Sequence, residues 1–238
     1  MDLLASALVY LGLLAVVVGA IRWRKRGLRM AAAGVLAVFA GFLWPAHLTR
    51  VREVRTRLDE FVPVYQFSEF HSIRIAAPPE RVYRAIQDVC PEEIAFYQTL
   101  TWIRRFGRRG SEGILNAPPR QPLLETATRK GFIRLVDDPG REIAIGVAGA
   151  GKGSWAITPQ DFQALDRPLM IKIGMNFRIE EEDAGHCLLT TETRVSTVGR
   201  DARRGFQVYW RLIYPGSSTI RYMWLRAIRE RAELAARS

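Results

Sequence analysis

The sequence Ile171-Lys-Ile-Gly-Met-Asn-Phe-Arg-Ile-Glu180 alternates apolar and polar side chains with a period of two. This alternation predicts a β-strand with one face on a core, because successive side chains of a strand point to opposite sides. The apolar face carries Ile171, Ile173, Met175, Phe177 and Ile179. We expect this strand to lie within an antiparallel sheet, with these side chains toward the interior.

Shorter strand patterns surround this one. The turn sequences Asp137-Asp-Pro-Gly140 and Glu182-Asp-Ala-Gly185 each separate two apolar runs, which is typical of hairpins. Helices are predicted from Pro78 and from Pro91, since proline followed by glutamate suits a first helical turn. The predicted strands are residues 70–76, 131–136, 142–148, 171–180 and 187–197.

The last forty residues predict one long amphipathic helix. Phe206, Tyr209, Trp210 and Ile213 follow a spacing of i, i+3, i+4 and i+7, and the stripe resumes after residue 218. Pro215 lies between the two halves, where it removes a backbone hydrogen bond and is expected to kink the helix. We expect the arginines of this helix on its outer face.

The order of these elements predicts an α+β fold in which a curved antiparallel sheet wraps around the long C-terminal helix. The space between sheet and helix would be lined by the inward strand face and the aromatic stripe. His71 shares the parity of its inward-facing neighbours and would either line this space or form a hydrogen-bonded core residue. The residues predicted to bind a ligand are His71, Ile173, Met175, Phe177, Phe206, Tyr209, Trp210 and Ile213.

Residues 1–50 predict a two-helix transmembrane hairpin. The run 3–21 is uncharged and long enough to cross a hydrocarbon core of roughly 30 Å, and a second apolar run covers 30–48. Trp23 and Trp44 occupy positions typical of interfacial anchors. A cleaved signal peptide would leave the second run unexplained, and a hairpin buried in a soluble protein would need a polar face. Residues 51–66 are expected to form a juxtamembrane linker that begins with a helix over 51–60.

The net charge of +11 is concentrated near the chain ends. Residues 58–199 hold 17 Lys and Arg against 19 Asp and Glu, so the centre of the chain offers no basic surface for nucleic acid. Residues 1–57 hold nine basic residues against two acidic ones, which a membrane surface explains. Five of these nine lie between the apolar runs and four follow the second run, so the positive-inside rule favours an extracytoplasmic soluble domain by a single charge.

Four stretches carry a family resemblance. They are His71-Ser-Ile-Arg-Ile-Ala-Ala-Pro-Pro-Glu-Arg-Val-Tyr83, Asp138-Pro-Gly-Arg-Glu142, Thr191-Glu-Thr-Arg-Val195 and Tyr209-Trp-Arg-Leu-Ile-Tyr-Pro-Gly-Ser217. Residues 67–233 resemble the START-like or SRPBCC superfamily, which has the helix-grip fold and includes polyketide cyclase/dehydrase-like proteins. We expect the corresponding domain to cover residues 67–238. The last two stretches resemble a bacterial branch of it. The resemblance implies a cavity for a hydrophobic ligand. It implies no fixed catalytic residues, so none are assigned.

Other motifs favour structural roles. Residues 146–154 fit GxxxxGK, but a glycine follows the lysine and no helix is expected there, so the stretch is interpreted as a loop over the cavity mouth. The acidic run 180–183 is typical of a solvated hairpin tip. Glu192 is expected to pair with Arg194. Cys90 and Cys187 lack CxxC spacing, and the three histidines lie far apart, so no metal or cofactor is predicted.

Three functions remain open at the level of the sequence. The favoured hypothesis is a membrane-anchored carrier or sensor for a hydrophobic, lipid-like ligand. The alternatives are a cyclase/dehydratase-type enzyme with a hydrophobic substrate, and an envelope interaction module whose cavity is collapsed. A cavity volume would test the last alternative, and a polar dyad inside the cavity would favour the enzyme.

Overall fold

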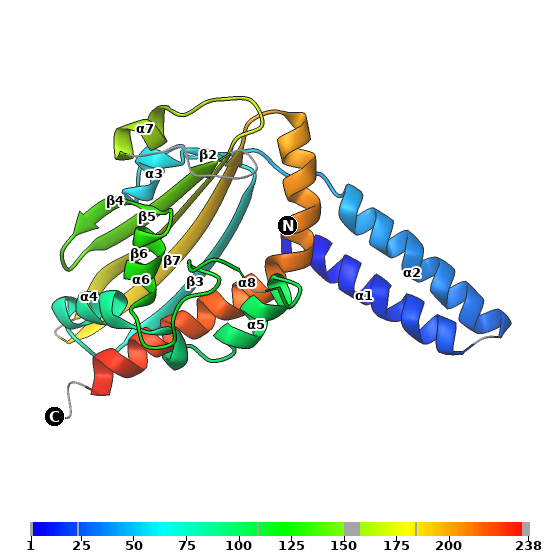
Figure 1. Ribbon diagram of the computed structural model, residues 1–238, viewed down its shortest axis with the longest axis horizontal. Coiled ribbons are helices and arrows are strands. Elements are labelled where there is room, and N and C mark those ends of the chain that lie inside the picture. Colours follow the sequence, from blue (N-terminus) through cyan, green and yellow to red (C-terminus); the bar gives the residue numbers. More distant parts are fainter. Residues whose placement is uncertain (1, 23, 109, 150–157, 184, 235–238) are drawn as a thin grey trace.

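The computed structural model describes residues 2–22, 24–108, 110–149, 158–183 and 185–234. A hairpin of two long helices extends from an α+β domain (Figure 1). The elements in chain order are α1 (Asp2–Ile21), α2 (Lys25–Leu43), β1 (Thr49–Arg50), α3 (Leu58–Phe61), β2 (Val64–Tyr65), β3 (Phe67–Ile75), α4 (Pro79–Asp88), the 3-10 helix η1 (Pro91–Glu93), α5 (Tyr97–Arg104), α6 (Leu123–Arg129), β4 (Ile133–Asp138), β5 (Glu142–Gly149), α7 (Pro159–Ala164), β6 (Ile171–Asp183), β7 (His186–Thr197) and α8 (Arg200–Leu234).

The sheet confirms the predicted architecture. Its five strands are antiparallel in the order β3-β7-β6-β5-β4, and β6 lies in the middle, with Met175 opposite Ile145 on one side and Thr193 on the other. The long helix α8 lies across one face of the sheet. The chain therefore has the helix-grip arrangement expected from the order of its elements.

The main core lies between the sheet, α4, α6 and the second half of α8. Phe177 and Ile75 of the sheet are almost completely buried there, and Trp224 of α8 meets the Phe177 ring at an edge-on distance of 4.9 Å. Each large apolar side chain buried in this way contributes about 2 kcal/mol. This packing holds α8 against the sheet.

Helix α8 is continuous through Pro215, and Figure 1 shows it bent near its middle. Proline has no N–H to give to the carbonyl of Arg211, four residues earlier, and its ring crowds that turn. The kink predicted from the sequence is therefore confirmed. It allows the two halves of the helix to follow different directions along the domain.

Several predicted helix boundaries were wrong. The helix expected over 51–60 is confined to α3, because the amides of Arg55 and Thr56 are hydrogen-bonded to the Asp59 carboxylate. The helix expected from Pro91 is split into η1 and α5 by Phe96, whose backbone is left-handed at a φ of 63°.

The second hairpin helix and two short helices also differ from expectation. The run 30–48 lies partly outside α2, which begins at Lys25 and ends at Leu43, because a residue that precedes proline, here Trp44, disfavours helical backbone. The helices α6 and α7 were not predicted. Each begins beside a proline and is too short to show a clear apolar period.

The two hairpin helices approach each other closely along a row of glycines. A Cβ atom built on Gly34 of α2 would lie 2.6 Å from the carbonyl oxygen of Gly12, and one on Gly12 would lie 2.7 Å from that of Gly34. Only glycine permits such backbone contact, which is typical of helix pairs in membranes. Gly19, Gly27 and Gly41 are equally close to the opposite helix.

The outer face of the sheet is covered as well. Leu58 and Val62 are buried there against Gly174 of β6, and α7 adds Phe162. The face that the sequence predicted as polar is therefore largely hidden. Its polar residue Asn176 is 2% exposed and donates to Glu142 at 2.7 Å.

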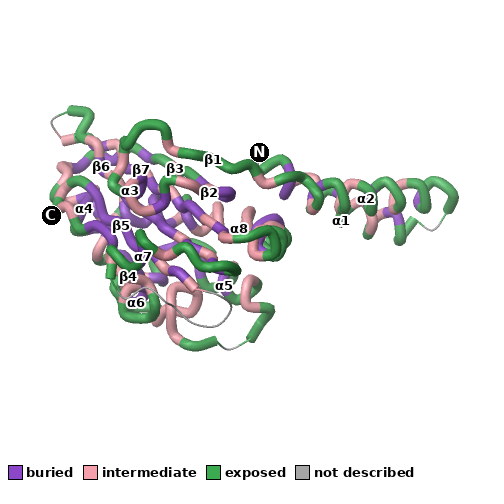
Figure 2. Tube along the Cα trace, turned by 90° about the horizontal axis from the view of Figure 1, so that it is seen from above, coloured by how far each residue is buried: buried purple, intermediate pink, exposed green. Residues whose placement is uncertain are grey.

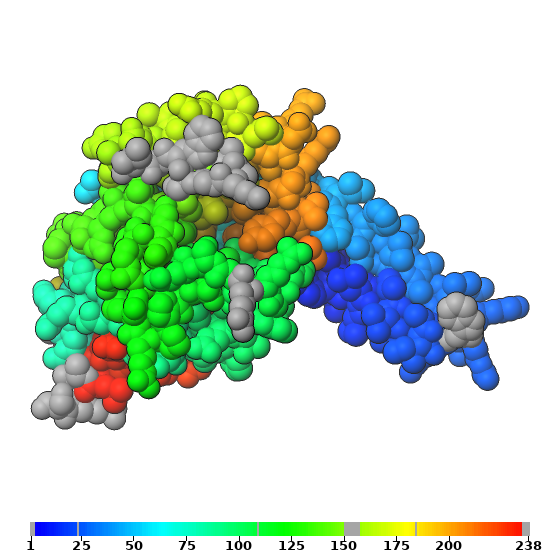
Figure 3. All heavy atoms as spheres, viewed as in Figure 1, coloured from blue at the N-terminus to red at the C-terminus, as the bar shows by residue number. Residues whose placement is uncertain are grey.

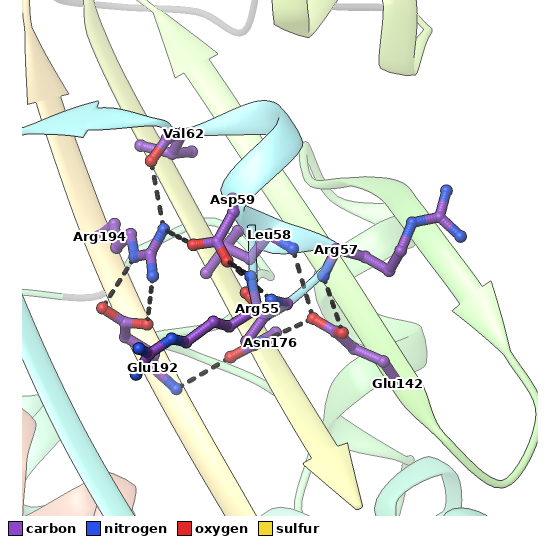
Figure 4. A network of polar contacts seen from close by, with 10 residues as sticks. Arg55, Arg57, Leu58, Asp59, Val62, Glu142, Asn176, Glu192 and Arg194 are labelled. Carbon is purple, nitrogen blue, oxygen red and sulfur yellow. Dashed lines mark hydrogen bonds and ion pairs between the residues drawn. The ribbon is translucent and has the colours of Figure 1, made fainter. Parts of the chain in front are cut away.

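An ion-pair network fixes this covering segment to the sheet (Figure 4). Arg194 of β7 donates to the Asp59 carboxylate at 2.5 Å and to both oxygens of Glu192 at 2.7 Å, so the predicted pairing with Glu192 is confirmed. Burial by itself would raise the pKa of Asp59. The hydrogen bonds from the amides of Thr56 and Arg55 and from Arg194 outweigh burial, and the pKa lies below its usual value.

Loss of the Asp59 charge should weaken this attachment. We expect Asp59→Asn to lower the free energy of unfolding of the full chain by about 2 kcal/mol, because Arg194 keeps Glu192 but loses a buried charged partner. Urea unfolding in a mild detergent measures the change. Glu53→Gln is the control, since its pair with Arg55 is exposed and should contribute less than about 0.5 kcal/mol. Equal effects of the two substitutions would contradict this account.

Candidate ligand cavity

A cavity of about 260 Å³ lies between the sheet and α8. Strands β5, β6 and β7 form one wall, α8 forms the opposite wall, and α5 with the segment 114–132 closes the side. The residues that line it are Tyr97, Thr101, Arg104, Ile114, Leu115, Leu123, Phe132, Val147, Ile173, Met175, Thr193, Val195, Phe206, Trp210, Ser217, Ile220, Arg221 and Trp224.

The lining is mainly apolar. Phe206 and Trp210 come from the first half of α8 and stack with their ring centroids 5.8 Å apart. Ile220 and Trp224 come from the second half, beyond the kink at Pro215. The bend in α8 therefore lets both halves of the helix contribute side chains to one cavity.

Arg221 is the main polar group in this wall. Its side chain is 10% exposed, and its Nη2 donates to Thr193 Oγ1 at 2.9 Å and to the Met175 sulfur at 3.2 Å. The guanidinium also lies 5.3 Å from the centre of the Trp224 ring. Burial lowers the pKa of Arg221, although Glu69 opposes this effect. The cavity wall thus carries a buried cation among mainly aromatic and aliphatic side chains.

Two further charged side chains stand near this cation. Glu69 of β3 is buried behind it, with Oε1 at 3.7 Å from Arg221 Nε and at 3.2 Å from the Ser217 hydroxyl. Arg104 of α5 lines the cavity and donates to the Tyr209 hydroxyl at 2.8 Å. The described lining therefore includes two arginines and no aspartate or glutamate.

The structure brings together half of the residues predicted to bind a ligand. Ile173, Met175, Phe206 and Trp210 all line the cavity. Their common position follows from the two patterns that predicted them, since alternate residues of β6 face α8 and the stripe of α8 faces the sheet.

The other four predicted residues lie outside the lining. Phe177 is buried in the core next to Trp224, and Ile213 packs beside Trp210 without reaching the cavity. Tyr209 is 37% exposed and contacts Arg104. His71 is half-buried on the inward face of β3, where its Nε2 lies 3.2 Å from the Ser218 hydroxyl.

The sequence did not predict the polar part of the site. The arginines of the last helix were expected on its outer face, but Arg211 and Arg221 are buried. Arg221 directly follows Ile220 and precedes Trp224 by three residues, so the helical spacing placed it beside the apolar stripe. A basic residue in that position is normally read as solvent-exposed, and only the position of Glu69 and Thr193 on the sheet explains its burial.

The structure also places the beginning of the glycine-rich stretch and the two cysteines that the sequence singled out. Gly146 belongs to β5, where a Cβ would meet Leu135 at 2.7 Å, and the interpretation of 150–157 as a loop over the cavity mouth lies outside the described residues. Cys90 and Cys187 are both free thiols, and Cys187 is buried. Within the described part of the chain, no group of three or more His, Cys, Asp or Glu is arranged to hold a metal ion.

Comparison with known proteins gives structural likenesses only. No family model and no curated protein matches the chain. One similar structure is the di-domain aromatase/cyclase BexL from the BE-7585A biosynthetic pathway, at 16% identity and a TM-score of 0.35, with 72% of this chain and 48% of BexL covered. The chain thus spans about half the length of BexL.

Two other likenesses cover most of the matched protein. The Zhui aromatase/cyclase from Streptomyces sp. R1128 has 14% identity and a TM-score of 0.30, with 70% of this chain and 93% of that chain covered. CalU16 from Micromonospora echinospora has 17% identity and a TM-score of 0.27, with 80% and 95% covered. The strand order and α8, rather than these superpositions, confirm that the chain has the helix-grip fold of the START-like superfamily it resembles.

The surroundings of His71 predict that the stability of the protein depends on pH. Burial has the largest effect and lowers the pKa of His71 below its ordinary value, although Glu69 opposes this shift. A lowered histidine pKa means that the unfolded chain binds the proton more readily, so stability is lost as the pH falls below about 6.5. We expect the thermal midpoint of the full chain to decrease between pH 7 and pH 5, and His71→Asn to flatten this dependence.

The exposed His186 supplies the control for this measurement. It is paired with Asp183 at a hairpin tip, with a side chain that is 57% exposed. His186→Gln should leave the slope between pH 7 and pH 5 unchanged. A slope that survives His71→Asn would show that another group is responsible.

Proposed function

We propose that this protein is a membrane-anchored binding protein that holds a hydrophobic, lipid-like ligand between its sheet and α8. The observation that carries the proposal is the cavity of about 260 Å³ with its mainly apolar wall. Pockets that bind small molecules are typically apolar, with a few polar groups that fix orientation. The same cavity argues against an interaction module with a collapsed interior.

The cavity size favours a small ligand. Its volume lies just below the range of about 300–1,000 Å³ that is typical of ligand pockets. Burial of an alkyl chain gains about 0.8 kcal/mol per methylene, so eight methylenes would supply about 6 kcal/mol before ordering costs. Micromolar binding of a short chain or compact ring system therefore needs no unusual interaction.

A binding role fits the described lining better than catalysis does. The cavity wall contains no cysteine, histidine, aspartate or glutamate among its described residues. These are the side chains that most often act as nucleophiles or transfer protons. The buried Arg221 is the observation that keeps a cyclase/dehydratase-type enzyme as a second candidate, because a fixed cation can stabilise a developing negative charge.

Membrane anchoring rests on the exposed surface of the hairpin. Two helices, over 3–21 and 25–43, are long and apolar enough to span a bilayer. Figure 2 shows them largely exposed outside the domain, and Leu11, Ile21 and Leu36 are 65%, 77% and 70% exposed. Helices of a soluble core would be buried instead. The hairpin would place the soluble domain on one side of the membrane, and the charge count favours the extracytoplasmic side.

The hairpin also contacts the first half of α8, which contributes Phe206 and Trp210 to the cavity. Tyr10 donates to the Leu212 carbonyl at 2.5 Å, and Gln207 donates to the Phe42 carbonyl at 2.6 Å. Figure 3 shows the blue hairpin meeting the orange part of α8. Because Phe206 and Trp210 belong to that part, the proposed anchor would hold the cavity close to the membrane, where lipid-like ligands are concentrated.

Tryptophan fluorescence of the full chain in a mild detergent tests ligand binding. Trp210 and Trp224 line the cavity, so decanol and longer alcohols are expected to change the emission in a saturable way. Ile173→Phe should fill the cavity and weaken binding at least tenfold. Ile171→Phe is the matched control, because Ile171 shares the strand and its inward face but lies outside the lining. Absence of a saturable response, or equal loss in both variants, would contradict the binding role.

Extraction of membranes with carbonate at high pH tests the anchor. Two apolar spans should keep the full chain in the membrane pellet, since carbonate removes proteins held only by surface charge. Recovery of the full-length chain in the supernatant would contradict the membrane-spanning hairpin. A chain shortened by the length of a signal peptide would show that α1 had been cleaved.

A further inference from the structure

The cavity contains a buried cation whose hydrogen-bonding capacity is only partly used. Arg221 donates through Nη2 to Thr193 and Met175, and its Nε lies 3.7 Å from Glu69, beyond hydrogen-bonding distance. Its third nitrogen, Nη1, is buried and has no hydrogen-bond partner among the described residues. A charged group left in this state is costly to bury, because it has given up its water without full replacement.

The charges around the cavity also favour an anionic group. Arg104 and Arg221 both line the cavity, and Glu69 is the carboxylate paired with Arg221. The second oxygen of Glu69 also has no hydrogen-bond partner within the described part of the chain, but Glu69 does not belong to the lining. The described lining therefore carries two positive charges and no negative charge, which leaves room for one anionic group inside the cavity.

We infer that the ligand is an amphiphile with a single anionic head, of the carboxylate type, whose oxygens accept hydrogen bonds from Arg221 Nη1. This inference rests on the proposed binding function and specifies its ligand class. Nη1 carries two N–H groups, and hydrogen bonds between an arginine and a carboxylate are about twice as strong as neutral ones. The apolar body of the ligand lies against Ile173, Phe206 and Trp210, on the aliphatic and aromatic part of the wall.

Comparison of a fatty acid with a neutral alcohol of the same chain length separates the contribution of the anionic head to the affinity from that of the alkyl chain. Decanoic acid and decanol are titrated at pH 8 into the full chain in dodecyl maltoside, with tryptophan emission as the readout. We expect the ionised acid to bind at least tenfold more tightly than the alcohol. Arg221→Gln should abolish this preference while the affinity for decanol changes less than threefold.

Two further variants make the result specific. Arg221→Gln leaves the buried Glu69 carboxylate without its charged partner. If this variant does not fold, the double variant Glu69→Gln/Arg221→Gln removes both charges and should show the same loss of preference for the acid. Arg226→Gln is the matched control, since Arg226 lies on α8 but its partly exposed side chain pairs with Glu230 outside the cavity. It should retain the preference for the acid.

The outcomes separate this inference from the function on which it rests. Equal affinities for acid and alcohol would overturn the anionic head and leave hydrophobic binding intact. A preference for the acid that persists in the Arg221 variants would also overturn the inference. Binding of neither probe would overturn the proposed function together with it.

Discussion

The edge-on contact between Phe177 and Trp224 joins α8 to the middle of the sheet, and the positions of the other functional elements follow from it. It fixes the second half of α8 across β6 and β7, so Arg221 faces Thr193. The bend near Pro215 then directs the first half toward the hairpin. A straight helix of 35 residues would extend well beyond one sheet, whereas the bent helix both lines the cavity and contacts the N-terminal hairpin.

Both faces of the sheet are buried, so the sheet also holds the segment that precedes it in the chain. On the inner face the apolar row of β6 meets α8, and on the outer face Leu58 and Val62 cover Gly174. Arg194 and Asp59 fasten this cover with a buried ion pair. The segment between the hairpin and β3 is therefore part of the folded domain. It forms a fixed connection between the two N-terminal helices and the sheet.

The sequence predicted the parts of this fold that depend on periodic patterns. The alternation around Met175 and the stripe around Trp210 predicted the sheet, the long helix and four residues of the cavity lining. Each pattern arises because one whole face of the strand or helix is buried, and such burial is visible as a period in the local sequence. The kink at Pro215 was predictable because proline acts on its own helix whatever surrounds it.

The remaining features depend on contacts between distant segments. Arg221 is buried because Glu69 of β3 and Thr193 of β7 lie beside it in the fold. The sequence around Arg221 does not indicate these contacts. The outer cover was missed because Asn176 and Gly174 look like solvent-facing residues until α3 is placed over them. Phe177 shares the parity of Met175 but lies further along β6, where Trp224 fills the space that a cavity would need.

The central claim is that the space between sheet and α8 holds a hydrophobic ligand. Native mass spectrometry of the full chain, purified from its own membranes in a mild detergent, tests it most directly. We expect a bound small amphiphile at a stoichiometry near one, retained when detergent is stripped in the gas phase and released on unfolding. A chain that carries only detergent, with no small molecule in its organic extract, would contradict it.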